Sequence, residues 1–130
     1  MTTTPAPTDD RAGPVLVVDD DVEIRSCLRL VLETEGYAVL EAADGTQALD
    51  TLTHAPLPCV ILLDLMMPVM SGWEFLDALR ESQKLAGIPV VVVSAYPPPQ
   101  GVPSLKKPLD LDGLLGVVSE HCSKSHGPTA

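Results

Sequence analysis

The feature that most constrains the fold is a set of short, unbroken aliphatic runs. These runs are Val15–Val18, Val60–Leu63 and Val90–Val93. Continuous apolar runs of this length are typical of parallel β-strands that are buried on both faces. Stretches with apolar residues three and four positions apart, as in amphipathic helices, lie between them. The alternation predicts an α/β fold in which helices cover both faces of a parallel sheet.

Weaker strand patterns occupy Tyr37–Glu41 and Ser104–Lys106, which brings the predicted sheet to five strands. Helix start signals support this interpretation, because several capping side chains precede a Glu or Gln by three positions. The residues in question are Asp20, Asp44 and Ser71, and Asp110 is the candidate cap of the last helix. The predicted order is therefore strand and helix in alternation along most of the chain.

Polar side chains follow four of the five predicted strands directly. They are Asp19 with Asp20, then Asp64, Ser94 and Lys107. Ligand sites of open α/β sheets lie outside the carboxyl ends of the strands, so these groups are expected to meet. Each has an ordinary explanation if taken alone: a helix cap for Asp20, a turn residue for Asp64, a surface residue for the other two. Their coincidence at four strand ends favours a functional site.

Converging carboxylates require a compensating cation, because two of them about 4 Å apart repel by about 4 kcal/mol at an effective dielectric of about 20. Oxygen ligands without His or Cys favour a hard ion such as Mg²⁺. Mg²⁺ in turn organises phosphoryl oxygens. A carboxylate can itself accept a phosphoryl group, and Asp64, alone at the end of a central strand, is the candidate nucleophile.

The segments VVDDD, LLDLMMPVMSG, VVVSAY and KKP resemble those of response-regulator receiver domains of two-component signalling. The most specific segment is Asp64–Gly72, in which Pro68 and Gly72 occupy their usual family positions. The resemblance implies a flavodoxin-like, doubly wound, five-stranded parallel sheet with strand order 2-1-3-4-5. It further implies one receiver domain over residues 13–122, between flexible tails at 1–12 and 123–130.

The resemblance also implies a role for each strand-end residue. Asp64 would be the phosphoacceptor, which takes its phosphoryl group from a sensor histidine kinase or a phosphotransfer protein. Ser94 would contact that group, and Lys107 would pair with its oxygens. The implied Mg²⁺ ligands are Asp19, Asp20, Asp64 and the backbone carbonyl of Met66. Such a chain is a signalling switch without an output domain of its own, not an enzyme, and it acts through contacts with a downstream protein.

Between Ser94 and Lys107 the sequence departs from the family. Three successive prolines cannot form the interior of a helix, so an extended Pro-rich segment is expected in place of the usual fourth helix. The face left without that helix is then a candidate surface for protein binding or homodimerisation. The family's switch aromatic is replaced by Ser104, and Tyr96 is the nearby aromatic residue that would substitute.

Composition excludes two classes of partner. The net charge of -10, from 8 basic and 18 acidic residues, argues against nucleic-acid binding. No apolar run reaches the roughly 18 residues of a membrane span, and no signal peptide is recognisable, so a cytoplasmic protein is expected. Cys27 and Cys59 are interpreted as reduced core residues, in keeping with that compartment.

Two other functions stay open. A phosphorylation-independent pseudo-receiver would use the same fold only as an interaction module. The missing helix and switch aromatic favour it, and the intact acidic site opposes it. A Mg²⁺-dependent phosphatase with an Asp nucleophile ranks lower. Those enzymes typically carry a second Asp two residues after the first, where this chain has Met66.

Overall fold

A computed structural model describes residues 13–67, 69–94, 101–106 and 110–123 of the chain. The strands are β1 (Val15–Val18), β2 (Val39–Ala42), β3 (Val60–Leu63), β4 (Val90–Ser94) and β5 (Ser104–Lys106). The helices are α1 (Val22–Thr34), α2 (Gly45–His54), α3 (Gly72–Glu81) and α4 (Leu111–His121). None of these described helices has the length and apolar character that crossing a bilayer requires.

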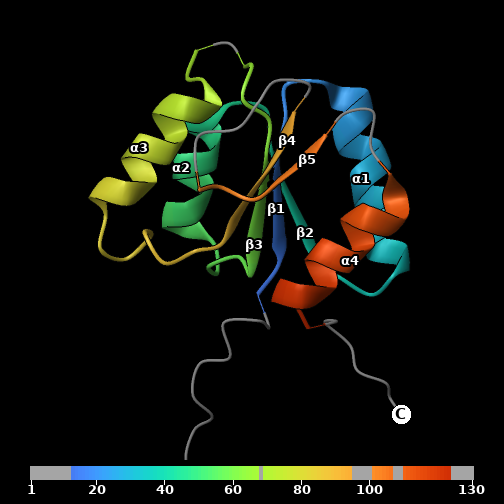
Figure 1. The fold of residues 1–130 in the computed structure, drawn as a ribbon. Helices are drawn as coiled ribbons and strands as arrows, with labels where there is room; N and C mark the ends of the chain where they lie inside the picture. Colours follow the sequence, from blue (N-terminus) through green and yellow to red (C-terminus); the bar gives the residue numbers. More distant parts are fainter. Residues whose placement is uncertain (1–12, 68, 95–100, 107–109, 124–130) are drawn as a thin grey trace, which may run out of the picture.

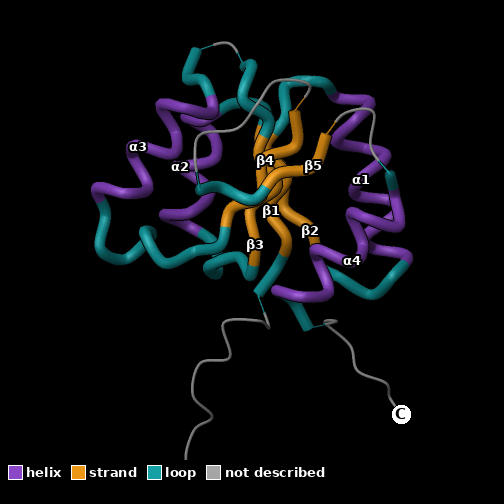
Figure 2. The backbone as a smooth tube through the Cα atoms, in the orientation of Figure 1, coloured by secondary structure: helices purple, strands orange, loops and turns teal. Residues whose placement is uncertain are grey.

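All five strands form one parallel sheet in the order β2-β1-β3-β4-β5, as predicted (Figures 1 and 2). Helices α1 and α4 cover one face of the sheet, and α2 and α3 cover the other. The aliphatic runs are buried on both faces because alternate side chains of a strand point in opposite directions. Val15 and Val17, for example, belong to the α1/α4 core, whereas Leu16 and Val18 belong to the α2/α3 core.

The predicted helix caps hold at three of four helices. Asp44, Ser71 and Asp110 are the N-caps of α2, α3 and α4, and Ser71 forms a full capping box with Glu74. For α1 the prediction of Asp20 is wrong, because the next residue, Asp21, is the cap. The second strand also begins two residues later than Tyr37, where the expected range started.

The crossover from β4 to β5 contains no helix within the described residues, in agreement with the Pro-rich sequence. Pro103 accepts a hydrogen bond from the backbone N–H of Val92 at 2.9 Å, so this end of the crossover runs along β4. The side chain of Val92 is fully buried even without a family-type fourth helix. An exposed apolar face therefore does not extend over this part of β4. Tyr96 and residues 97–100 lie outside the described residues.

A disulfide joins Cys59, directly before β3, to Cys122 at the end of α4. The two positions are 63 residues apart in sequence, yet their Cα atoms lie 5.3 Å apart and both residues are buried. Cys59 is a core residue as predicted, but the prediction that it is reduced is wrong. For Cys27 the opposite holds, because it is a free cysteine as predicted but is exposed on α1 and not in the core.

Candidate metal centre at the carboxyl edge of the sheet

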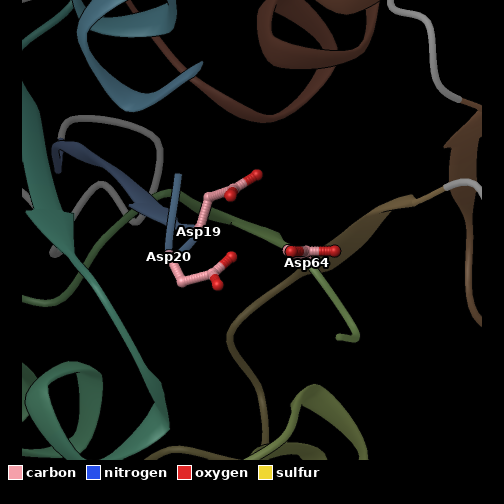
Figure 3. Close-up of side chains that lie close together, drawn as sticks. All are labelled: Asp19, Asp20 and Asp64. Carbon is pink, nitrogen blue, oxygen red and sulfur yellow. The ribbon is translucent and has the colours of Figure 1, made fainter. Parts of the chain in front are cut away.

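Three carboxylates meet where β1 and β3 end. Val18 and Leu63 are paired in the sheet, so Asp19 and Asp64 follow neighbouring strands at the same level. Each of Asp19, Asp20 and Asp64 offers one oxygen, and these oxygens lie within 4.8 Å of one another (Figure 3). Asp19 and Asp64 are buried, whereas Asp20 is exposed. The cluster is therefore anchored in the sheet but open to solvent on one side.

The donor set of this cluster fits Mg²⁺. All three groups are carboxylates, and an ion held by few carboxylates that completes its shell with water is typical of Mg²⁺. Without a cation the carboxylates repel one another, and burial of two of them increases that cost. The arrangement can thus bind a hard divalent ion beside a buried, potentially nucleophilic carboxylate.

The turn between β1 and α1 explains why Asp20 remains available. The carboxylate of Asp21 accepts hydrogen bonds from the N–H groups of Glu23 at 2.9 Å and Ile24 at 3.3 Å. Asp21 also donates its own N–H to Asp19 Oδ1 at 2.9 Å, which orients that buried side chain. Because Asp21 performs the capping, the cap explanation for Asp20 no longer applies, and its carboxylate can face the cluster.

The loop after β3 is held close to Asp64 by a glycine. A Cβ atom on Gly72 would lie 2.6 Å from the carbonyl oxygen of Asp64 and 2.7 Å from Cα of Leu65. Gly72 also donates its N–H to the carbonyl of Leu65 at 3.0 Å. Any larger residue would push this loop away from the strand end, which gives a physical reason for glycine at this position of the motif.

Val69, in the same loop, has strained backbone geometry. Its φ is 68°, although it is β-branched, and its side chain is 82% exposed. Such a residue disfavours the left-handed region, and the strain costs of order 1–3 kcal/mol. We expect Val69→Gly to raise the free energy of unfolding by about 1 kcal/mol, since glycine's greater freedom in the unfolded chain offsets part of the gain. Urea denaturation measures the change.

A matched control is Val22→Gly, at an exposed position in the first turn of α1. It should lower the stability, because glycine is a poor helix former. A Val69→Gly chain no more stable than the wild type would show that the left-handed conformation is not costly there.

Of the other predicted site residues, the structure describes Ser94 and Met66 but not Lys107. Ser94 ends β4 and is buried at the same edge of the sheet. It pairs with Lys106 of β5, so the chain leaves β5 at that edge, but Lys107 lies outside the described residues. Met66, predicted as a metal ligand through its carbonyl, lies next to the cluster, since its N–H donates to Asp64 Oδ1 at 3.4 Å. Arg25 donates to the carbonyl of Asp19 at 2.7 Å, and it is not among the predicted site residues because no motif spacing marks it.

Comparison with known proteins identifies the family. The family model described as "Response regulator receiver domain" matches residues 15–115. The chain belongs to the response regulator receiver domain family. This confirms the resemblance and places the chain among the receiver domains of two-component systems, a family in which phosphorylation on Asp is typical.

Individual relatives agree with this assignment. The receiver domain is 33% identical over 117 residues to an uncharacterized 14.6 kDa protein of Leptolyngbya boryana, covering 83% of this chain and 88% of that protein. It is 43% identical over 83 residues to sensor histidine kinase TmoS of Ectopseudomonas mendocina, or 64% of this chain and 8% of the kinase. It spans 36% and 49% of two curated response regulators that it matches.

The fold is shared with solved receiver structures. Chemotaxis protein CheY4 of Vibrio cholerae superposes with a TM-score of 0.75 at 32% identity, covering 84% of this chain and 98% of that one. The flavodoxin-like fold class predicted from the sequence is thereby confirmed.

Proposed function

We propose that this receiver domain is a phosphorylatable signalling switch that accepts a phosphoryl group on Asp64 in a Mg²⁺-dependent reaction. The observation that carries the proposal is the meeting of Asp19, Asp20 and Asp64, whose ligand oxygens lie within 4.8 Å of one another. The donor would be a sensor histidine kinase or phosphotransfer protein, and the cytoplasm is the expected location. We also propose that the receiver domain spans residues 13–122.

Asp64 supplies the nucleophile. One of its carboxylate oxygens forms a bond to phosphorus while the bond between phosphorus and the donor's leaving atom breaks, which leaves an acyl phosphate on the chain. Asp19 and Asp20, with Asp64 and the carbonyl of Met66, would hold Mg²⁺ beside this oxygen. When bound, the ion neutralises negative charge on the transferred group and on the carboxylates.

Two further residues would stabilise the phosphoryl group. Ser94 would donate a hydroxyl hydrogen bond to it, which its position at the end of β4 supports. Lys107 would pair its ammonium group with the phosphoryl oxygens. The phosphorylated and unphosphorylated surfaces would then differ at this edge of the sheet, and a partner protein would distinguish them.

Labelling with acetyl phosphate tests the proposal. We expect intact-mass spectrometry to show one added phosphoryl group, removable by hydroxylamine, with Mg²⁺ and none after chelation with EDTA. Asp20→Asn should lose most of this labelling because it removes a metal ligand. Asp21→Asn is the matched control, because asparagine also caps helices and this side chain is occupied with Glu23 and Ile24.

The competing functions predict different results. A phosphorylation-independent interaction module would acquire no label under any of these conditions. A phosphatase would release inorganic phosphate over many turnovers without a retained label. Equal labelling with and without Mg²⁺ would contradict the proposed metal requirement.

A further inference from the structure

Arg25 of α1 contacts the acidic cluster through the backbone of Asp19. Its Nη1 donates to the carbonyl oxygen of Asp19 at 2.7 Å. Its own N–H donates to the carbonyl of Asp21 at 3.0 Å. That second bond is an ordinary backbone bond of the α1 helix, so the contact specific to the arginine side chain is the one with Asp19, directly before the exposed Asp20.

The guanidinium of Arg25 is itself fixed by β2. Its Nε donates to Glu41 Oε1 at 3.1 Å, and Arg29 donates to the other oxygen, Oε2, at 2.8 Å. These hydrogen bonds, that from Arg29 foremost, hold the pKa of the Glu41 carboxyl below its usual value. Only 15% of the Arg25 side chain is exposed, against 47% for Arg29.

The next residue of β2 completes the arrangement. Ala42, which follows Glu41, accepts the N–H of Asp19 at 3.1 Å. The N–H of Asp19 is thus bound to the β2 backbone, and its carbonyl is bound to a side chain that β2 anchors. The backbone of Asp19 is therefore held at both its N–H and its carbonyl by groups of β2, directly or through Arg25.

We infer that Arg25 is a positioning residue for the metal centre. By fixing the peptide between Asp19 and Asp20, it sets the directions in which their two carboxylates leave the chain. Without it, mutual repulsion would spread the carboxylates when no cation is bound, and the ion would have to reorder them on binding. The inference rests on the proposed Mg²⁺ site.

Positioning and simple charge effects predict opposite changes in Mg²⁺ affinity. If Arg25 acted only as a nearby positive charge, its removal would strengthen Mg²⁺ binding by relieving repulsion. If it positions the ligands, its removal weakens binding, and loss of such an outer-shell partner typically costs 10–100-fold. The sign of the change therefore separates the two explanations.

The experiment is isothermal titration of the full chain with MgCl₂, at a temperature where circular dichroism shows each variant to be folded. We expect Arg25→Gln to weaken Mg²⁺ binding by about tenfold. Arg25→Lys should restore part of the affinity, because lysine can reach one of the two acceptors but not bridge both. A binding constant for Arg25→Gln equal to or tighter than that of the wild type would overturn the inference.

Arg29→Gln is the matched control. It removes the same charge from the same helix and the same Glu41 partner, but within the described residues Arg29 bonds to Glu33 and Glu41 and not to the clustered aspartates. Its Mg²⁺ affinity should stay within about twofold of the wild type, because exposed ion pairs contribute little. An equal loss in both arginine variants would also overturn the inference.

Two further arms keep the outcome decisive. If Arg25→Gln does not fold, Glu41→Gln replaces it, since that variant keeps Arg25 but weakens its anchor; unchanged Mg²⁺ affinity there would count against positioning. A wild-type chain that binds no Mg²⁺ would overturn the proposed function together with this inference. Binding by the wild type with no loss in the Arg25 variants would overturn the inference alone.

Discussion

Replacing Asp64 with asparagine should abolish phosphoryl labelling of the chain by acetyl phosphate and Mg²⁺. The amide has nearly the shape of the carboxylate but lacks the negatively charged oxygen that attacks phosphorus. It also replaces one of the three clustered carboxylates with a neutral amide, so Mg²⁺ binding should weaken as well. Intact-mass spectrometry measures the label, and circular dichroism establishes that the variant is folded.

The control for this substitution is Asp50→Asn on α2. Its side chain is 76% exposed and lies outside the clustered carboxylates, so its labelling should equal that of the wild type. Peptide mapping of the labelled wild-type chain should locate the phosphoryl group on Asp64. Undiminished labelling of Asp64→Asn, or a label mapped to another residue, would refute Asp64 as the acceptor.

Reduction of the Cys59–Cys122 disulfide should lower the free energy of unfolding by about 2–4 kcal/mol. The bond closes a long loop, with a sequence separation of 63, and so restricts the unfolded chain much more than the folded one. Urea denaturation with and without dithiothreitol measures the difference. In a reducing compartment the chain would have the stability of its reduced form.

Two variants test this attribution. Cys122→Ala should have the stability of the reduced wild-type chain both with and without dithiothreitol, so that dithiothreitol no longer changes it. Cys27→Ala should keep the full response, because Cys27 is exposed and outside the disulfide. A wild-type chain whose denaturation is unaffected by dithiothreitol would contradict a stabilising role for the bond.

The acidic cluster could be predicted because its position follows from topology alone. Parallel strands that are buried on both faces are recognisable from unbroken aliphatic runs, and their carboxyl ends share one edge of the sheet. Asp19 and Asp64 are therefore brought together without any knowledge of side-chain geometry. The one-residue error at the cap of α1 is of a different kind, since Asp20 and Asp21 carry the same side chain.

Contacts between side chains were beyond prediction from spacing. Cys59 and Cys122 meet because the start of β3 and the end of α4 lie side by side, which depends on how that helix crosses the sheet. The role of Arg25 likewise depends on Glu41 facing α1 from β2. Neither pairing leaves a periodic signal in the sequence.

The position of β1 in the sheet has a consequence for how a signal could leave the site. This strand is flanked along its whole length by β2 and β3, whereas β5 has three residues and a single neighbour. Asp19 and Asp20 thus follow an interior strand that is paired on both sides, whereas β5 is one of the two edge strands. We therefore expect that a movement accompanying phosphorylation of Asp64 would cost less free energy at β5 than at β1, where the hydrogen bonds to two neighbouring strands would have to change.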